Sequence, residues 1–173
     1  MKKIEIYTKR LLLKPLGSEY LQTVNDYAMD SDIRYMVRLP NESIDETARF
    51  LKKVELEWEK ENPEFYEFAV LYRNEHIGAV SIYFENEIGE IGWIINKKYR
   101  GNGFAYEAAE ALVKYFAANL GTKHFIAHCD TENIASYKVM EKLGMTRTEE
   151  CGRRRNRFAA NDSFEYKYEL ILL

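Results

Sequence analysis

One stretch of the sequence decides the fold, Lys98-Tyr99-Arg100-Gly101-Asn102-Gly103-Phe104-Ala105. It follows an apolar, strand-like segment at residues 91–95 and leads into a strongly helical segment at residues 106–120. Two glycines one residue apart let the backbone turn sharply and approach a ligand without an intervening Cβ, although many strand-to-helix turns use glycine for geometry alone. A helix that begins at such a turn offers unpaired N–H groups and the positive end of its dipole, which together bind phosphate. The stretch therefore predicts a pyrophosphate-binding turn between a strand and a helix.

The segments on either side of this turn follow the pattern of an α+β fold. Alternating apolar and polar residues predict antiparallel strands before the turn, and a buried strand after the helix completes one parallel β-α-β crossover. We expect a central mixed, mostly antiparallel sheet of about six to seven strands flanked by helices. The expected strands lie at residues 9–16, 68–72, 76–84, 89–95 and 124–129, with two more in 145–173.

Helical periodicity marks the remaining segments. The expected helices cover residues 18–30, a short part of 31–40, 41–62, 106–120 and 133–143. The helix after the glycine turn carries apolar residues at helical spacing from Ala105 to Leu120, and Gly121 is placed to end it. A ligand site is expected at the carboxyl ends of the strands that flank this crossover helix.

The composition is that of one globular domain covering residues 1–173, with 46% hydrophobic and 31% charged residues. The net charge of −3 argues against a nucleic-acid-binding protein, which would be strongly basic. No apolar run approaches the roughly 20 residues that span a bilayer, and residues 1–5 (MKKIE) lack the apolar core of a secretory signal. Two cysteines, Cys129 and Cys151, are too few for a disulfide framework. A reduced, cytoplasmic protein that binds neither nucleic acid nor membrane is expected.

A second motif lies one helix and one strand after the glycine turn. In it, Asn133 precedes a short helix that ends in Leu143-Gly144-Met145. Together with the opening run at residues 9–16 (KRLLLKPL), the two motifs resemble the GNAT-type acyl-CoA-dependent N-acetyltransferases, most of all the branch that acetylates ribosomal-protein N-termini and related amines. The resemblance spans nearly the whole chain, is strongest from Glu90 to Met145 and is weakest from Asp30 to Phe65. These motifs are specific to the superfamily and not to a substrate.

The resemblance implies acetyl-CoA as the cosubstrate. In the family, a Gln/Arg-x-x-Gly-x-Gly/Ala turn binds the CoA pyrophosphate through backbone N–H groups. The matching positions here are Lys98, Arg100, Gly101, Asn102, Gly103, Phe104 and Ala105. Lys98 departs from the usual Gln or Arg, but contacts made by the main chain do not depend on it. The strand before the turn would pair with the pantetheine arm or simply belong to the core, and its residues are Trp93, Ile94 and Ile95.

The resemblance also implies roles at the reacting atoms. Asn133 matches a family Asn that hydrogen-bonds the CoA arm, and it suits a helix N-cap equally well. Amine acetylation needs a base, which Glu90 would supply, unless it is an exposed or cross-strand-paired glutamate. Backbone N–H groups of residues 94–95 would polarise the thioester carbonyl. Many relatives carry a Tyr where this chain has Met140, so Ser136 is assigned to the leaving sulfur.

Other reactive side chains have plainer interpretations. Cys129 is expected to be a buried structural thiol, since no histidine base is paired with it in the sequence. The three histidines lack metal-ligand spacing, so no metal site is expected. The arginine-rich run at residues 152–157 is expected to be a solvated hairpin rim, with a lip for an acidic partner or a phosphate as the alternative.

The preferred function is acetyl-CoA-dependent N-acetylation of a primary amine by direct transfer, with a protein N-terminal amine as the acceptor. A small-molecule amine, either a polyamine or an aminoglycoside, is the alternative within the class. Acidic residues on the long helix would suit a cationic acceptor, although solvation explains them as well; they are Glu42, Asp45 and Glu46. A non-catalytic CoA-binding sensor, motivated by Met140, is the alternative from another class, whereas a nucleotide-binding domain is disfavoured because no Walker lysine follows the glycines. The protein is expected to be a monomer or homodimer.

Overall fold

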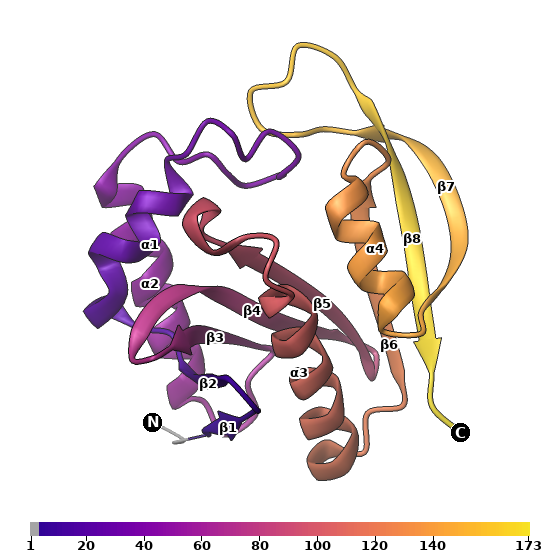
Figure 1. Ribbon diagram of the computed structural model, residues 1–173, viewed down its shortest axis with the longest axis horizontal. Helices are drawn as coiled ribbons and strands as arrows, with labels where there is room; N and C mark the ends of the chain where they lie inside the picture. The colour runs from indigo at the N-terminus through magenta and orange to yellow at the C-terminus, as the bar shows by residue number, and fades with distance from the viewer. Residues whose placement is uncertain (1–3) are drawn as a thin grey trace.

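The computed structural model describes residues 4–173. The first three residues, on which the expectation about a secretory signal partly rests, lie outside this range. The described chain forms one eight-stranded sheet with helices packed against it (Figure 1). Its strands are β1 (Ile6–Tyr7), β2 (Leu11–Pro15), β3 (Phe65–Tyr72), β4 (Glu75–Glu85), β5 (Ile88–Ile95), β6 (His124–Asp130), β7 (Thr146–Arg154) and β8 (Ser163–Ile171). Its helices are α1 (Leu21–Ala28), α2 (Ile44–Glu59), α3 (Phe104–Leu120) and α4 (Ile134–Lys142), with short 3-10 turns η1 (Ser18–Tyr20) and η2 (Lys97–Tyr99).

The strands lie in the order β1-β2-β3-β4-β5-β6-β8-β7, and every neighbouring pair is antiparallel except β5 and β6. The α+β class and the single parallel crossover, made by α3 between β5 and β6, are therefore confirmed. The sheet has more strands than expected because β1 forms a hairpin with β2, in which Ile6 lies opposite Leu13. A strand of two residues is too short to show a period in the sequence.

α1, α2 and α4 begin and end inside their expected ranges. α2 starts at Ile44 because Ser43 caps it, its Oγ accepting a hydrogen bond from the backbone N–H of Glu46 at 3.3 Å. α3 starts two residues earlier than expected, directly after the glycine turn. Figure 1 shows α1 and α2 side by side at the left of the sheet, where α2 contacts β3 and α1 contacts β4, and it shows α4 beside β6.

Residues 31–40 hold turns and no helix, so the expected short helix there is wrong. Carbonyl groups that a helix would use are bonded to the carboxy-terminal loop instead. Arg154 Nη2 donates to the carbonyl oxygen of residue 35 at 2.9 Å. Arg157 donates through its backbone N–H to the carbonyl oxygen of residue 36 and through Nη1 to that of residue 38, both at 2.9 Å. Partners more than a hundred residues away along the chain therefore decide this segment.

The arginine-rich run is only partly the solvated rim that the sequence predicts. The side chain of Arg154 is 7% exposed and forms an ion pair with Glu165. Arg157 pairs with Glu46 of α2 at 2.6 Å, whereas Arg155 remains exposed. The expectation of a solvated rim is wrong for Arg154 and Arg157, because a charged run in the sequence does not reveal the distant carboxylates and carbonyl groups that its side chains meet. The run ties the β7–β8 hairpin to residues 35–38 and to α2.

α3 packs an apolar face onto the sheet and so holds the glycine turn in place. Leu112 and Phe116 are fully buried, and the Phe116 ring centre lies 5.0 Å from that of Tyr66 and 6.3 Å from that of Phe68. Leu120, expected on the same face, is 51% exposed in the last turn. The predicted stripe is thus buried along most of the helix.

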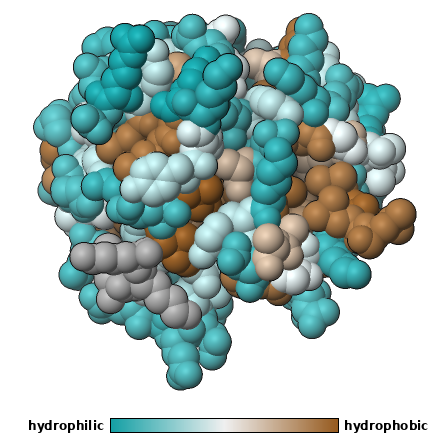
Figure 2. Space-filling view, turned by 60° about the horizontal axis from the view of Figure 1, so that its bottom comes forward, coloured by the Kyte–Doolittle hydropathy of each residue, from teal (hydrophilic) through white to brown (hydrophobic). Residues whose placement is uncertain are grey.

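The surface is mostly polar. Figure 2, in which the bottom of the molecule is turned forward, shows hydrophilic side chains over much of this face and hydrophobic ones in separate patches. Large exposed hydrophobic side chains sit on several different elements, among them Tyr7, Leu56 and Phe158. No helix within residues 4–173 is long and apolar enough to cross a membrane.

Removal of the Asn156 side chain tests the closure of the carboxy-terminal loop. Asn156 is 5% exposed, donates to Asp130 Oδ2 at 2.6 Å and accepts from Arg154 Nε at 2.9 Å. Asn156→Ala leaves the buried Asp130 carboxylate without one of its donors, so we expect the free energy of unfolding to fall by about 1.5–3 kcal/mol, measured by urea denaturation. Arg155→Ala is the control, because Arg155 pairs with Asp162 at an exposed site, and its loss should stay below about 0.5 kcal/mol. Equal losses in the two variants would contradict this account.

Candidate active site

The glycine turn has the backbone conformation that the sequence predicts. Gly101 and Gly103 adopt left-handed φ angles of +78° and +77°. Nothing lies within 4 Å of a Cβ built on Gly101, so the φ angle, and not a lack of space, favours glycine there. Gly103 is the N-cap of α3, and no side chain in the described chain caps this helix. The N–H groups of its first turn are therefore not used by a capping side chain, as an anion site at a helix start requires.

Side chains of the turn stabilise its shape. Asn102 Nδ2 donates to the carbonyl oxygens of Tyr99 at 3.0 Å and of Arg100 at 3.2 Å. Arg100 Nε donates to the carbonyl oxygen of Ile95 at 2.9 Å. Lys98 is exposed, and its backbone N–H is bonded to Asn96 Oδ1 at 3.1 Å. Asn102 and Arg100 thus hold the loop in place.

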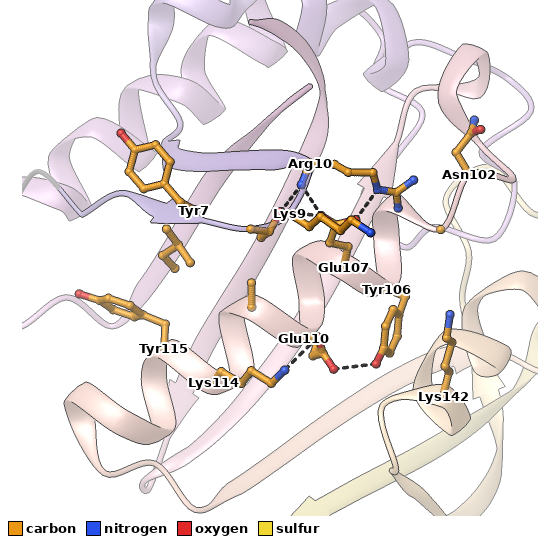
Figure 3. Close-up of a pocket in the computed structure, with 14 residues that line it drawn as sticks. Tyr7, Lys9, Arg10, Asn102, Tyr106, Glu107, Glu110, Lys114, Tyr115 and Lys142 are labelled. Atoms are coloured by element: carbon orange, nitrogen blue, oxygen red, sulfur yellow. Dashed lines mark hydrogen bonds and ion pairs between the residues drawn. The ribbon is translucent and has the colours of Figure 1, made fainter. Parts of the chain in front are cut away.

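The turn between β1 and β2 braces the first turn of α3 (Figure 3). Glu107 Oε1 accepts hydrogen bonds from Thr8 Oγ1 at 2.6 Å and from the backbone N–H of Arg10 at 2.8 Å, and its Oε2 accepts from Arg10 Nε at 2.6 Å. The Arg10 guanidinium also lies 4.5 Å from the centre of the Phe104 ring. The opening run at residues 9–16 contains Arg10, but nothing local marks Glu107 as its partner. These bonds fix where α3 begins.

This brace lines one side of a surface pocket of about 830 Å³ (Figure 3). The pocket reaches Asn102 and Gly103 of the glycine turn and ends at Lys142 of α4, which lies 4.1 Å from the ring centre of Tyr106. The glycine turn therefore opens onto a groove that carries several cationic side chains.

β5 and β6 are paired only at their beginnings. Residues 88–90 of β5 lie opposite residues 124–126 of β6, after which β5 continues beside β4 alone and β6 beside β8 alone. The two strands diverge from this point, so the β6-facing N–H and C=O groups of residues 91–95 have no strand partner. This is an edge to which an extended ligand can add its own amide groups.

A cavity of about 910 Å³ fills the space between the diverging strands and residues 35–41. It brings together five of the predicted site residues, namely Glu90, Trp93, Ile94, Asn133 and Ser136. Ile95 is 7% exposed and does not line the cavity, and its carbonyl is already bonded to Arg100. Lys98 and the glycine turn lie outside the cavity, beyond the end of β5.

The first turn of α4 forms another wall. Asn133 is confirmed as the N-cap of α4, because its Oδ1 accepts a hydrogen bond from the backbone N–H of Ser136 at 3.3 Å. Ser136 and Met140 both line the cavity, as expected of residues four apart on one helical face. Met140 is 1% exposed, whereas Tyr137 turns away and contacts the ring of Tyr166.

Glu90 is paired across the strands, and its partner is His128 of β6. A hydrogen bond of 2.8 Å joins Glu90 Oε1 to His128 Nδ1, and the Glu90 side chain is 50% exposed. The bond to His128 lowers the pKa of Glu90 and raises that of His128. A carboxylate held in its charged form in this way is a weak proton acceptor. Both residues line the cavity, and the sequence did not indicate a role for His128.

A second carboxylate of the cavity was missed by the sequence analysis. Glu67 of β3 is 8% exposed, and its Oε1 accepts a hydrogen bond from the Tyr83 hydroxyl at 2.7 Å. Burial raises the pKa of Glu67 to about 7 and also raises that of Tyr83. The one available signal was a lone acidic residue inside the apolar run at residues 65–71.

The acidic residues expected to attract a cationic acceptor are placed differently. Glu46 lines the cavity, but Arg157 neutralises it at 2.6 Å and holds its pKa below the usual value. Glu42 and Asp45 do not line the cavity and are exposed at the beginning of α2. The carboxylates that remain for a cationic ligand are those on the sheet, Glu67 of β3 and Glu90 of β5.

Other reactive groups have structural surroundings. Burial raises the pKa of the Cys129 thiol to about 11, so the thiol stays protonated and is a poor nucleophile. His76 is bonded to Thr23, and burial lowers its pKa to about 4. His124 is bonded to Glu169 at 2.6 Å. Within residues 4–173, no group of three or more His, Cys, Asp or Glu residues is placed to hold a metal ion.

The structure thus brings an uncapped helix start, which follows a glycine turn, close to the point where two strands diverge. The family profile described as the acetyltransferase (GNAT) domain matches residues 10–146, so the chain belongs to the GNAT acetyltransferases. It is 34% identical over 148 residues to the uncharacterized N-acetyltransferase YnaD of Bacillus subtilis (strain 168), with 83% of this chain and 84% of the relative covered. The chain is therefore an N-acetyltransferase.

Solved structures share the whole fold. A GNAT-family acetyltransferase from Bacillus anthracis is 29% identical, with a TM-score of 0.82 and coverage of 97% of this chain and 98% of that one. RimL, a ribosomal L7/L12 α-N-protein acetyltransferase solved in complex with coenzyme A, has a TM-score of 0.87 at 17% identity, with 98% of each chain covered. At that identity, the likeness to RimL shows the fold alone.

The pair formed by Glu90 and His128 can be tested by its effect on histidine titration. Because the pair raises the folded-state pKa of His128 above 6.5, it stabilises the fold below pH 6.5, and this contribution is lost as the pH rises through the folded-state pKa. Glu90→Gln removes the charged partner, so we expect the pKa of His128 to fall in an NMR titration of the imidazole signals. His76 provides an internal control, since its surroundings do not include Glu90. An unchanged pKa of His128 in the variant would refute the pairing.

Proposed function

We propose that this N-acetyltransferase uses acetyl-CoA and transfers its acetyl group directly to a primary amine, and that the amine is the N-terminus of a protein. The choice of acetyl-CoA as the donor rests on the cavity between the diverging strands β5 and β6, which lies near the uncapped amino end of α3. The unpaired edge of β5 suits an extended arm that contains amide groups, and the start of α3 suits a pyrophosphate.

The chain's own groups fit such a donor. The N–H groups at the beginning of α3, after Gly101 and Gly103, suit the pyrophosphate. The unpaired edge of β5 at Trp93 and Ile94 suits the amide groups of the pantetheine arm, and the Asn133 side chain faces the same cavity. Cations of the surface pocket, such as Lys142, suit a further phosphate of CoA. Coenzyme A bound to RimL supports this donor for the shared fold.

The geometry also supports direct transfer. The amine nitrogen must be neutral to attack the thioester carbonyl, and a backbone N–H on the unpaired edge of β5 would stabilise the oxygen as it becomes negative. Ser136 lines the cavity and would donate a hydrogen bond to the leaving sulfur. A thiolate needs little help to leave, because the conjugate base of a thiol with an ordinary pKa near 8.5 is only weakly basic. Met140 at the usual Tyr position is therefore compatible with turnover.

A protein N-terminus is favoured by the shape of the cavity and by the comparison. The volume of about 910 Å³ exceeds the space needed for a thioester and an amino group, so a first side chain also fits. Its wall at residues 35–39 carries Tyr35, Met36 and Leu39, which suit apolar parts of a peptide. RimL is described as acting on the α-amino group of ribosomal L7/L12, and it shares the fold over 98% of this chain.

Gly101→Ala tests the donor site. An alanine forced to the φ of +78° costs roughly 1–2 kcal/mol and moves the N–H groups that would hold the pyrophosphate. We expect calorimetry to show acetyl-CoA binding at least about tenfold weaker than in the unchanged protein. Gly144→Ala is the matched control, because Gly144 has a φ of +81° and equally open surroundings but lies at the end of α4. Equal weakening of binding in both variants would contradict the assignment.

The acceptor is tested by following thiol release from acetyl-CoA. Candidate acceptors are peptides with different N-terminal residues, spermidine and an aminoglycoside, and we expect turnover with the peptides, with the product acetylated at the α-amino group by mass spectrometry. Turnover of spermidine or the aminoglycoside alone would overturn the protein acceptor. Binding of acetyl-CoA with no turnover of any amine would contradict the reaction and favour a CoA-binding sensor.

A further inference from the structure

The polar residues of the cavity form a row across one face of the sheet. Glu67 of β3 lies opposite Ser81 of β4, which lies opposite Gly92 of β5. Side chains two residues apart share a face, so Tyr83 and Glu90, which are themselves cross-strand partners, stand on the same side as Glu67. The cavity therefore has one buried carboxylate on β3 and one half-exposed carboxylate on β5.

Glu67 is at a suitable distance from the strand edge that would hold the donor. Its register position is two strands from Gly92, and neighbouring strands are about 4.8 Å apart, so the two backbones are separated by roughly 10 Å. The Glu67 side chain stands up from the sheet into the cavity that residues 92–94 also line. An amino group bound between Glu67 and residues 92–94 would contact both the carboxylate and the thioester carbonyl.

The surroundings of Glu67 leave one oxygen for a ligand. Oε1 accepts from Tyr83, and Arg38 Nη1 in turn donates to the Tyr83 hydroxyl oxygen at 3.3 Å. No hydrogen bond to Oε2 is formed within the described chain, and Glu67 lines the cavity. From α1, Tyr27 faces the same carboxylate, and burial keeps this phenol neutral. The nearest cation, Arg38, reaches Glu67 only through Tyr83, so the carboxylate is not neutralised by a direct ion pair.

We propose that Glu67, held by Tyr83, binds the acceptor's ammonium group and removes the proton that blocks its attack. This assignment rests on the proposed function and names the base within it. The resemblance in sequence assigns the role of base to Glu90. Glu90 is less suited to it than Glu67, because Glu90 is half-exposed and already bonded to His128.

The ammonium nitrogen gives one proton to Glu67 Oε2, which becomes a neutral carboxylic acid, and the nitrogen regains its lone pair. The nitrogen forms a bond to the acetyl carbon, the carbon–sulfur bond breaks, and its electron pair leaves on sulfur. The second proton of the new amide nitrogen passes to the thiolate, and Glu67 returns its proton to solvent. The products are the acetylated amine, the thiol and one proton.

The titration of Glu67 suits this role. A base is most effective when its pKa lies near the working pH, and burial brings that of Glu67 to about 7. Because the base must be deprotonated, activity should fall as the pH drops below about 7. The other titratable or charged side chains that line the cavity are Tyr27, Tyr35, Arg38, Glu46, Tyr83, Glu90, His128, Cys129, Arg154, Arg157 and Glu165. Of these, His128 has the ordinary pKa nearest to 7, and its hydrogen bond to Glu90 raises that pKa, so His128 is the group to be distinguished from Glu67.

Glu67→Gln is the central test. It keeps the shape of the side chain and removes the proton acceptor, so we expect kcat for the best peptide to fall by about a hundredfold or more. Acetyl-CoA binding by calorimetry should stay within about threefold of the unchanged protein. Glu85→Gln, at the exposed end of β4, is the matched control and should leave kcat unchanged. A Glu67→Gln enzyme with kcat within about threefold of normal would overturn the proposal.

The pH profile of kcat separates Glu67 from its neighbours. We expect the fall in activity below about pH 7 to disappear in Glu67→Gln and to persist in His128→Gln and Glu90→Gln. Tyr83→Phe removes the donor that lowers the pKa of Glu67, so the acid limb should move to higher pH. This readout remains if Glu67→Gln does not fold. An acid limb that follows His128 and ignores Tyr83 would overturn the proposal, whereas an unchanged protein inactive on every amine would refute the proposed function itself.

Discussion

The short pairing between β5 and β6 is the constraint on which the site depends. Only three residues of each strand form the parallel ladder, and each strand then keeps its outer neighbour. α3 has to cross from the end of β5 to the beginning of β6, so its amino end lies where the strands diverge. Had the ladder continued to Ile95, the free N–H and C=O groups of β5 would be used up and the cavity would be closed. One interruption of the sheet thus produces both the edge and the opening beside the glycine turn.

The cavity is completed by parts of the chain that are far apart in sequence. Asp130 at the end of β6 accepts a hydrogen bond from buried Asn156, and Asn156 is bonded to Arg154. Arg154 and Arg157 then bind the carbonyl groups of residues 35–38, which form one wall. A buried carboxylate and a nearly buried guanidinium are tolerated here because each has several partners. The wall of the cavity is therefore set by the carboxy-terminal hairpin.

Two glutamates on one face of the sheet illustrate how surroundings assign roles. Glu90 is bonded to a histidine at the open side of the cavity, and its pKa is lowered. Glu67 lies two strands away, where burial outweighs the hydrogen bond from Tyr83, and its pKa is raised. A glutamate at position 90 therefore stays charged near neutral pH, whereas a glutamate at position 67 gains and loses a proton there.

The sequence by itself determined the features that depend on local backbone physics. Alternation predicted the meander of β3, β4 and β5, helical periodicity predicted α3, and the glycines at 101 and 103 predicted the turn, because period and left-handed φ are properties of neighbouring residues. Asn133 was likewise recognisable as a cap. The tertiary structure alone decided that residues 31–40 form no helix, that Arg154 and Arg157 are bound and not solvated, that His128 pairs with Glu90, and that Glu67 faces the cavity. Each of these depends on partners many residues away and on burial, and both come into existence only when the sheet and its carboxy-terminal hairpin have packed.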